Sequence, residues 1–574
     1  MNKAVLFLFL LIYGIEKSHA QLTDLASAPI NFTATKNIKP NIFFILDDSG
    51  SMAYSFLGDE VWTYLYINKI GYRSSLCNKI YYDPEVKYQP PIDANGNLFP
   101  NIDFFNAPFD GYQANSIKIN LSQDFMAWRS RFSNPPTPAS TTDMRSLQDC
   151  NECTSNDKAN DQIRNIQESA YYFIYKGNNK EKLGNYSIED QCRDYRFDTA
   201  ATSGSANWVK VIVGNQSGVN RSDERINFAN WFSYYRTRMM MTKSVIGYVF
   251  SALDNNYRVG FSSISYSGVA PITNSRSNSF LNIVDFNSEQ RAQFYRKIYN
   301  TFPGGSTPLR AALSKAGQIY AGQLISSDND PVQFSCQKNV SILFTDGFWT
   351  TSGETSTYGP FQIDGKTEVG NQDKDLPPPK GEGSAVWSNS LADVAAYYYE
   401  TDLRTPTLNN CRGDKNVCEN NVPLAKDGTG KNFQNMITHT VGLGAKGLLD
   451  YQDNYETALS GDFYDIKNKI RGWPAPTANN DQAKIDDLWH AAVNSGGKYF
   501  YVNDSKNLIQ KLSETLTVIQ AKEGSAAAAA SSSQEPVQRN NMVYISSYRS
   551  LAWDGDIEAR DITLSSVGVS AELK

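Results

Sequence analysis

Four short runs of consecutive apolar residues stand out in the hydrophobic pattern of the chain. Unbroken apolar runs of this length predict parallel strands buried on both faces, because a half-exposed strand would alternate apolar and polar residues. Lys498 to Val502 predicts a further strand near the carboxyl end. The four runs are Ile42 to Leu46, Val259 to Ile264, Val340 to Phe344, and Ile437 to Leu443.

Between these runs, apolar residues recur at helical spacing. One such pattern joins Phe228, Trp231, Phe232, Tyr235 and Met239 into one predicted helix. Strands that alternate with helices predict an α/β fold with a doubly wound, Rossmann-like sheet. The other predicted helices cover residues 309–320, 391–398, 488–493 and 508–519.

Three stretches inside this pattern are rich in Gly, Pro, Asn, Asp and Ser and lack a clear periodicity. They cover about residues 53–225, 348–388 and 405–432. Long irregular stretches inside an α/β domain are usually functional insertions at its rim, so we expect that here. The α/β domain with these insertions then runs from residue 39 to residue 523.

The composition changes again after residue 523. Residues 524–540 hold five consecutive Ala followed by three Ser, which predicts a low-complexity linker. Met542 to Tyr548 and Asp556 to Ile562 then predict two strands joined around Trp553-Asp554-Gly555. One hairpin cannot fold alone, so residues 541–574 are predicted to begin an incomplete β-rich domain.

Charge and the chain's amino end narrow the function classes. The formal net charge is −6, and no run of five Lys or Arg occurs, which argues against a nucleic-acid partner. Lys3, the apolar stretch Ala4 to Ile15, and Ser18-His19-Ala20 predict a signal peptide over residues 1–20. A short segment, residues 21–38, comes after it. No later stretch is apolar enough for a transmembrane helix. We therefore expect an exported protein.

Seven cysteines accompany this predicted export, and an oxidising compartment makes disulfides the default. Cys411 and Cys418 could close one loop. Cys150-x-x-Cys153 is compatible with a zinc site, a redox pair or two separate disulfides, of which disulfides are favoured. The odd number leaves one thiol over, and Cys336 is our choice for it. Cys77 and Cys192 complete the set.

The chemistry-bearing motif comes directly after the first predicted strand. Asp47, Ser49 and Ser51 lie at i, i+2 and i+4 beyond the strand's carboxyl end, where open α/β sheets bind ligands. A carboxylate and two hydroxyls are hard oxygen ligands of the kind that Mg²⁺, Mn²⁺ and Ca²⁺ prefer. An EF-hand is excluded because its required Gly and final Glu are absent at the corresponding positions, Met52 and Gly58.

Two later segments fit the same site. Gly304-Gly305-Ser306-Thr307-Pro308 precedes a predicted helix, where Thr307 could also be an ordinary helix N-cap. Thr345-Asp346-Gly347 comes after the strand Val340 to Phe344 and would otherwise be an ordinary turn. Together the three segments resemble the metal-ion-dependent adhesion site of von Willebrand factor A domains. The resemblance implies a divalent cation held by Asp47, Ser49, Ser51, Thr307 and Asp346, with an open position for a partner's acidic side chain. The long stretch between the first two segments departs from the family's pattern.

A closer resemblance runs from about residue 36 to the end. The chain is similar to the PilY/PilC family of type IV pilus tip adhesins and biogenesis factors. In that family a C-terminal β-propeller comes next. The segment Trp553-Asp554-Gly555 resembles the opening of that propeller. The matching segments are Ile38–Asn41, Asn230–Arg236, Cys336–Asn339, Thr345–Trp349, Asp393 with Tyr397–Tyr399, Asp402–Leu403, Thr440–Gly444 and Asp486–Ala492.

This resemblance implies location at the outer membrane surface or pilus tip, pilus assembly with minor pilins, and attachment to host or abiotic surfaces. A second hypothesis is a structural tip cap or assembly factor in which the metal only stiffens the fold. A third is a secreted hydrolase that uses the metal to activate water. The third is disfavoured, because no nucleophile elbow or His-Glu-x-x-His motif occurs and few histidines are present.

Three weaker signals remain. Arg412, Gly413 and Asp414 form an RGD tripeptide in the Cys411–Cys418 loop, where it could meet an integrin, although so short a match often arises by chance. His490 lies in a helical pattern and is predicted to be a packed, hydrogen-bonded core residue. Asp93 begins a stretch that resembles part of a calcium loop, but a turn is favoured.

Overall fold

A computed structural model gives the fold and divides the chain into Met1–Ile38 and Lys39–Lys574. All described residues except Ile38 belong to the second unit. The predicted signal peptide, Cys150, Cys153, Cys192, Gly413 and Asp414 lie outside the described residues. The structure describes residues 38–57, 73–125, 169–176, 182–183, 186–187, 208–265, 279–351, 354, 359–382, 387–412, 416–424, 429–444, 446–477, 479–520, 525–531, 542–549, 554–564 and 571–573.

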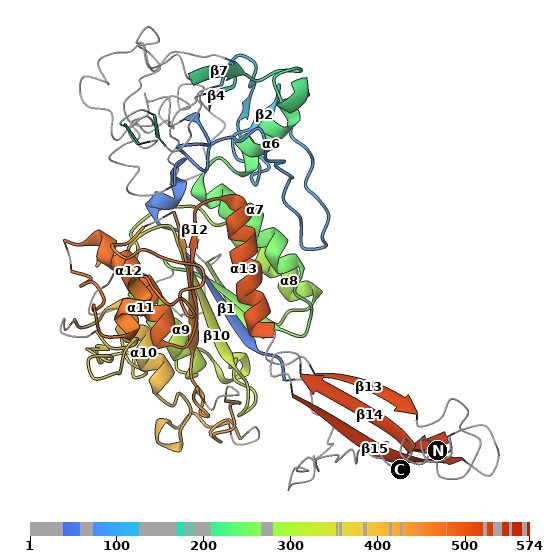
Figure 1. Ribbon diagram of the computed structural model, residues 1–574, viewed down its shortest axis with the longest axis vertical. Helices are drawn as coiled ribbons and strands as arrows, with labels where there is room; N and C mark the ends of the chain where they lie inside the picture. The colour runs from blue at the N-terminus through green and yellow to red at the C-terminus, as the bar shows by residue number, and fades with distance from the viewer. Residues whose placement is uncertain are drawn as a thin grey trace, which may run out of the picture. The chain divides into compact units, whose positions relative to one another are not determined.

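A six-stranded sheet with the order β12-β11-β10-β1-β8-β9 forms the centre (Figure 1). All neighbouring strands are parallel except β9, which runs antiparallel to β8. The five strands predicted from the hydrophobic pattern are confirmed, whereas the edge strand β9 was not predicted. The strands are β1 (Asn41–Leu46), β8 (Arg258–Ser263), β9 (Phe280–Asp285), β10 (Asn339–Thr345), β11 (Ile437–Leu443) and β12 (Tyr499–Val502).

Helices cover both faces of this sheet, because side chains along a buried strand point alternately to either side. On β1, Phe44 packs against Phe250 and Phe294, in the core under α7 (Arg238–Ser251), α8 (Ser288–Tyr299) and α13 (Ser505–Gln520). Its neighbours Phe43 and Ile45 belong to the opposite core, under α9 (Leu309–Tyr320), α10 (Leu391–Glu400) and α12 (Asp481–Asn494). This arrangement confirms the predicted α/β class.

The single helix predicted across residues 228–239 is wrong. The structure has two helices, α6 (Arg225–Tyr234) and α7, and residues 235–237 separate them. Thr237 adopts an extended backbone, and its side chain accepts a hydrogen bond from the Met240 N–H, so it caps a new helix. The apolar spacing continues across the break because both helices bury aromatic residues in the same core.

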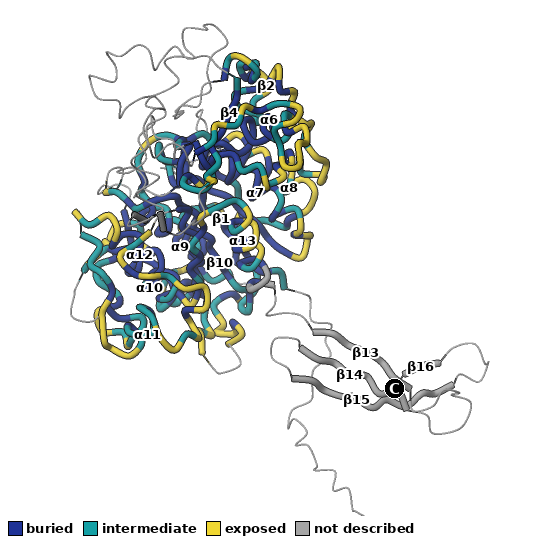
Figure 2. Tube along the Cα trace, turned by 45° about the horizontal axis from the view of Figure 1, so that its top comes forward, coloured by how far each residue is buried: buried dark blue, intermediate teal, exposed yellow. Residues whose placement is uncertain are grey.

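Within the described residues, the stretch from about residue 53 to 225 consists largely of turns and irregular chain, as predicted, and its aromatic side chains pack in a layer on α6. The Tyr82 ring lies 4.8 Å from Phe228 and 5.9 Å from Trp231, measured between centroids. Short strand pairs also occur in this stretch, and Figure 2 shows buried chain around α6. They are β2 (Ala107–Pro108) with β3 (Lys118–Ile119), β4 (Tyr171–Tyr175) with β7 (Trp208–Ile212), and β5 (Lys182–Leu183) with β6 (Tyr186–Ser187).

The last described residues form a separate antiparallel sheet. β14 (Met542–Arg549) and β15 (Asp554–Leu564) correspond to the two strands predicted there. β13 (Ser525–Ser531) pairs with β14, so the alanine run expected in a linker is a strand. Alanine has a low intrinsic tendency to form strands, and pairing with a neighbouring strand outweighs that tendency here. β16 (Ala571–Leu573) completes this sheet.

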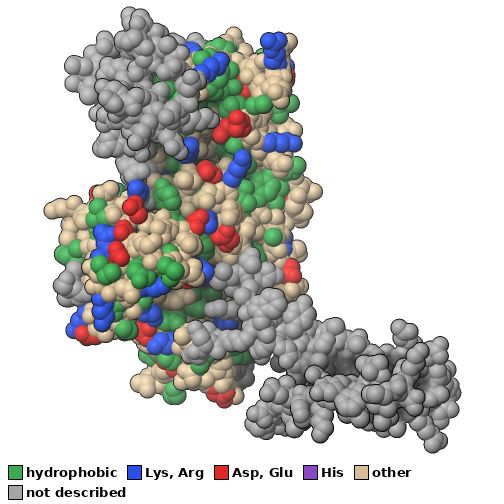
Figure 3. Space-filling view, viewed as in Figure 1, with side chains coloured by type: hydrophobic (Ala, Val, Ile, Leu, Met, Phe, Trp, Pro, Cys, Tyr) green, Lys and Arg blue, Asp and Glu red, His purple; other side chains and the backbone are tan. Residues whose placement is uncertain are grey.

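The remaining described helical elements are short, and none is a membrane span. They are α11 (Asp462–Lys467) and the 3-10 turns η1 (Gly50–Ala53), η5 (Val219–Arg221), η7 (Ser327–Asn329) and η8 (Pro406–Leu408). Across the described part of the chain, no helix is both long and apolar enough to cross a bilayer. On the face in Figure 3, acidic and basic side chains are interspersed over the described surface.

Candidate metal site

The loops that carry the predicted ligands meet where the strand order of the sheet reverses. Numbered along the chain, the six strands run 3-2-1-4-5-6 across the sheet, so the first strand, β1, lies beside the fourth, β10. Open α/β sheets bind ligands in the crevice at this switch point, beyond the carboxyl ends of the strands. Asp47 comes directly after β1 and Asp346 directly after β10.

The loop after β1 folds tightly around the Asp47 carboxylate, which is fully buried. The Ser49 N–H donates to Asp47 Oδ1 at 2.7 Å, and the Thr345 hydroxyl donates to Asp47 Oδ2 at 2.6 Å. The second bond joins the end of β10 to the end of β1. This turn fixes the carboxylate and begins η1, which contains Ser51.

Three oxygen atoms form a continuous row beside it. Ser49 Oγ lies 3.0 Å from Ser51 Oγ, and the Ser51 hydroxyl donates to Asp346 Oδ1 at 2.9 Å. Adjacent ligands of an octahedral ion with bonds of about 2.1 Å are separated by roughly 3.0 Å. The two separations therefore fit two edges of such a coordination shell that share the Ser51 oxygen.

The glycine loop before α9 is held against the same turn by backbone hydrogen bonds. The Gly304 N–H donates to the Asp48 carbonyl at 2.7 Å, and the Gly50 N–H donates to the Gly305 carbonyl at 3.1 Å. Gly305 has φ +88°, a conformation that favours glycine. The structure thus brings the Thr307 segment next to the Asp47 loop, although α6, α7 and α8 lie between them in the chain.

Thr307 itself lies at the edge of the cluster. Its backbone N–H donates to the Thr350 hydroxyl at 3.1 Å, and its carbonyl accepts from the Thr350 N–H at 3.0 Å. The N-cap of α9 is Pro308, without a side-chain cap, so Thr307 is not the cap residue. Among the described contacts, no hydrogen bond links its side chain directly to the other four candidate ligands.

Burial dominates the electrostatics of the site. It raises the pKa of Asp47, Asp48 and Asp346 to about 6 each. Arg238 opposes this effect at Asp346, where its guanidinium Nη1 donates to Oδ2 at 2.7 Å and both side chains are fully buried. Sequence reasoning missed Arg238, because nothing in its local pattern distinguishes a core arginine from a surface one.

The donor types suit a hard cation. Within the described ranges, no group of three or more Asp, Glu, His or Cys side chains is placed to hold a metal ion. A cation here would therefore draw on two carboxylates, Asp47 and Asp346, and on hydroxyls such as Ser49 and Ser51. Oxygen donors of this mixture suit Mg²⁺, Mn²⁺ or Ca²⁺ rather than a softer metal.

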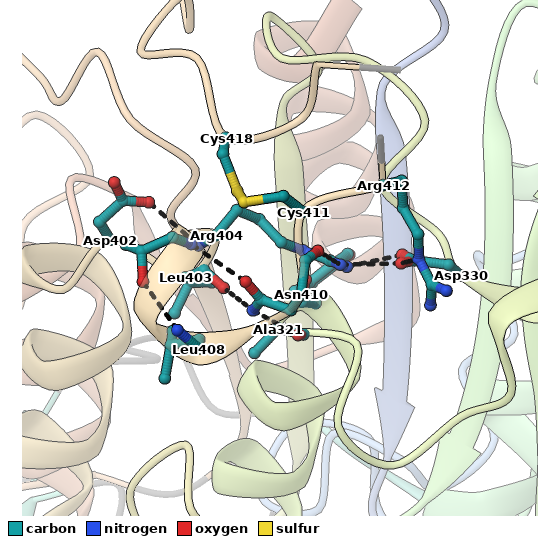
Figure 4. The surroundings of a disulfide bond; sticks show 12 residues. Ala321, Asp330, Asp402, Leu403, Arg404, Leu408, Asn410, Cys411, Arg412 and Cys418 are labelled. Atoms are coloured by element: carbon teal, nitrogen blue, oxygen red, sulfur yellow. Dashed lines mark hydrogen bonds and ion pairs between the residues drawn. A yellow bond between two sulfur atoms is a disulfide. The ribbon is translucent and has the colours of Figure 1, made fainter. Parts of the chain in front are cut away.

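The RGD segment has a different environment, shown in Figure 4. Cys411 and Cys418 form the disulfide that the sequence suggested, and Cys336 remains a thiol as predicted. Arg412 Nε donates to Asp330 Oδ2 at 2.8 Å, and Asp330 also pairs with the buried Arg404. Arg412 therefore takes part in an internal ion pair. Gly413 and Asp414 lie outside the described residues.

A second group of buried carboxylates surrounds the start of α10, and sequence reasoning missed it too. We call Asp373, Glu382, Asp393 and Asp487 the α10 carboxylates. Asp487 Oδ2 accepts from the Leu391 N–H and the Trp349 indole N–H, both at 2.8 Å. Its Oδ1 accepts from the Ala392 N–H at 3.0 Å. This residue thus caps α10 from the neighbouring helix α12.

His490 packs beside these carboxylates as the core residue that was predicted. Its ring stacks on Trp473 at 4.4 Å, and Nε2 lies within hydrogen-bonding distance of the Lys380 carbonyl, 2.5 Å away. Burial lowers the pKa of His490 to about 3. Asp373 Oδ2 lies 3.4 Å from the same nitrogen, Nε2. A neutral, stacked imidazole in this position packs α12 against the neighbouring loops.

Comparison with known proteins identifies relatives along almost the whole chain. The type IV pilus biogenesis factor PilY1 of Pseudomonas aeruginosa strain PAK is 26% identical to this chain. The alignment is 586 positions long, gaps included, and covers 96% of this chain. PilY1 of strain UCBPP-PA14 is 26% identical over 554 residues, or 93% of this chain. This chain is thus similar to PilY1 proteins over almost its whole length. No protein-family model matches it.

The chain spans less than half of its PilY1 relatives, 45% and 43% of the PAK and UCBPP-PA14 proteins. Among solved structures, the crystal structure of the pilus adhesin SpaC from Lactobacillus rhamnosus GG has 12% sequence identity and a TM-score of 0.22. It covers 54% of this chain and 33% of that chain. Agreement at this level does not bear on the fold.

Proposed function

We propose that this chain is a type IV pilus adhesion and biogenesis protein that binds its partners through a divalent cation. Residues 39–523 are then a von Willebrand factor A-type domain with insertions, and β13 to β16 open a β-propeller. The protein is exported to the outer membrane surface and pilus tip, where it meets minor pilins and host or abiotic surfaces. It acts as a binding protein and not as an enzyme.

One observation carries the cation part of this proposal. Three segments far apart in sequence meet at the switch point, where Ser51 Oγ lies within hydrogen-bonding distance of both Ser49 Oγ and Asp346 Oδ1. Buried carboxylates at such a place need positive charge nearby, because an uncompensated buried charge is very unfavourable. When bound, the cation supplies a coordination position that a partner's carboxylate can fill.

Individual residues take separate parts in this proposal. Asp47, Ser49, Ser51 and Asp346 hold the cation, and Thr307 contributes from the edge of the site, directly or through water. Thr345 orients Asp47 through the 2.6 Å hydrogen bond, and the Gly304–Gly305 loop fixes the approach of Thr307. The ion is Mg²⁺ or Ca²⁺, with Mn²⁺ as a close chemical substitute.

Titration of the full chain with Mn²⁺ by calorimetry tests the site directly. We expect saturable binding in the native chain and its loss in Asp47→Ala. Asp93→Ala is the control, because Asp93 is a partly exposed carboxylate whose oxygens close a local turn with Asn95 and Asn97. Equal Mn²⁺ affinity in the native chain and Asp47→Ala would refute the site.

Attachment assays separate adhesion from the alternative, a structural tip cap whose metal only stiffens the fold. Cells that produce the Asp47→Ala protein, or cells treated with chelator, should lose attachment while the protein still co-purifies with minor pilins. Attachment that survives both treatments favours the structural alternative. Loss of pilin association in Asp346→Ala would show that the cation is needed for assembly itself.

A further inference from the structure

Arg238 is an unusual neighbour for a cation site. It is the first residue of α7, is fully buried, and forms an ion pair with Asp346 across 2.7 Å. A cation at the N-terminus of a helix is unfavourable, because that end carries a partial positive charge. Its position therefore depends on the compensating carboxylate of Asp346.

The guanidinium is held firmly in this place. Its Nε donates to the Phe56 carbonyl at 2.7 Å, and the Arg238 N–H donates to the Tyr54 carbonyl at 3.0 Å. The rings of Tyr54 and Phe56 stack on each other and lie 5.4 and 5.0 Å from the guanidinium carbon. Arg238 consequently cannot leave Asp346 without disrupting the segment after η1.

Charge at the site is then only partly compensated. Among the described side chains at the site, Asp47, Asp48 and Asp346 carry −3 when ionised, and Arg238 brings the sum over these four groups to −2. In the described part of the chain, Asp47 and Asp48 take part in no ion pair of their own; hydroxyls and backbone N–H groups are their partners. A divalent cation would bring the sum to zero.

We propose that Arg238 sets the cation affinity of this site by cancelling one carboxylate charge and holding Asp346 Oδ2 away from the ion. This inference rests on the proposed cation site. With Oδ2 engaged, Asp346 offers the ion a single oxygen, Oδ1. Fewer anionic ligands mean weaker binding, so the site fills at the high cation concentrations outside cells and empties without collapse when they fall.

Four variants test the proposal as a charge series, with Mn²⁺ alone as the probe. Arg238→Met leaves −3 and should bind Mn²⁺ at least about tenfold more tightly than the native chain. Asp346→Asn leaves −1 and should bind at least about tenfold more weakly. Arg238→Met combined with Asp346→Asn restores −2 and should match the native chain within about fivefold. Arg238→Lys keeps the charge and should do the same.

A matched control separates charge at the site from loss of a buried arginine. Arg404→Met removes another buried arginine, which pairs with Asp330 away from the switch point, and should leave the Mn²⁺ affinity unchanged. A second readout is thermal unfolding in chelator and in excess Mn²⁺. Arg238→Met should gain far more from Mn²⁺ than the native chain, because its empty site holds three uncompensated carboxylates.

The proposal fails if Arg238→Met binds Mn²⁺ no more tightly than the native chain, or if Arg238→Lys behaves like Arg238→Met. Should Arg238→Met not fold, the double variant decides the matter, because replacing both members of a buried pair preserves the fold best. A double variant as weak as Asp346→Asn would overturn the inference. Failure of the native chain to bind Mn²⁺ would instead refute the proposed cation site.

Discussion

Two regions of this molecule bury several carboxylates, and they do so for different reasons. At the switch point, Asp346 meets an arginine and hydroxyl groups, and Ser51 bridges toward Ser49. Around α10, Asp487 instead accepts from three N–H groups. Asp393 accepts from the Gln372 N–H and from the N–H and hydroxyl of the cap residue Ser390. Burial of acids therefore does not itself indicate a metal site.

The partners of the carboxylates distinguish the two regions. N–H donors hold Asp487 and Asp393 in place and give these two carboxylates a structural role as helix cap and loop anchor. Hydroxyl groups at the switch point can instead rotate and present their oxygens to an ion. The comparison predicts that variants around α10 change stability without changing cation binding, and that variants at the switch point change cation binding.

Asp487→Ala should have the largest effect on stability. It leaves the Leu391 and Ala392 N–H groups and the Trp349 indole N–H buried without an acceptor, which should lower the free energy of unfolding by about 3–5 kcal/mol. Urea denaturation measures this loss. Asp450→Ala, at an 82% exposed carboxylate, is the control and should change it by less than about 0.5 kcal/mol. Similar losses in both variants would contradict the capping role.

Asp346→Asn should rank next when unfolding is measured in chelator. The change removes the carboxylate that pairs with the buried Arg238, which should lower the free energy of unfolding by about 3 kcal/mol. Combining it with Arg238→Met should recover most of that loss, because no buried charge then remains unpaired. An additive, larger loss in the double variant would show that the pair stabilises the fold through shape rather than charge.

Asp373→Asn tests the α10 carboxylates through pH. Asp373 Oδ1 and Asn494 Oδ1 are buried without a partner among the described residues, although the Asn494 amide donates to Asp373 Oδ2 at 2.6 Å. We expect a proton on Asp373 to satisfy this pair. Burial, then Asp393 and Glu382, raises the pKa of Asp373 from 3.8 to about 8.

The sign of the pH effect depends on that shift. Between pH 3.8 and about 8 the folded chain keeps a proton that the unfolded chain has released, so stability falls as the pH rises. Asp373→Asn removes this titration and should flatten the stability curve by roughly 1–3 kcal/mol between pH 5 and 8. Urea denaturation at four pH values is the measurement. Parallel curves for the two proteins would mean that Asp373 is already ionised at pH 5.

Two serine variants give the smallest and most selective contrast. Ser51→Ala should lower the free energy of unfolding by less than about 1 kcal/mol, yet weaken Mn²⁺ binding in calorimetry. Ser390→Ala removes the capping box of α10, which should reduce stability by about 1 kcal/mol and leave Mn²⁺ affinity unchanged. Interchanged results would reverse the assignment of the two regions.

The sequence by itself determined the buried strands, the order of strands and helices, and the position of Asp47 and Asp346 after two of those strands. Apolar runs and turn residues are local signals, so β1, β8, β10, β11 and β12 were predicted from them. The break between α6 and α7 escaped prediction because both helices bury apolar residues, which hides the change of direction. The β13 strand escaped because its pairing partner, and not its own alanines, makes it extended.

Only the tertiary structure decided which charged groups meet. Arg238 and Asp346 lie 108 positions apart, and Asp373 and Asn494 lie 121 apart, so no local pattern links either pair. A buried charge takes its role from its partner, because desolvation makes every uncompensated group unfavourable. The sequence therefore indicated where a cation could bind, and the folded chain showed that an arginine already shares the site.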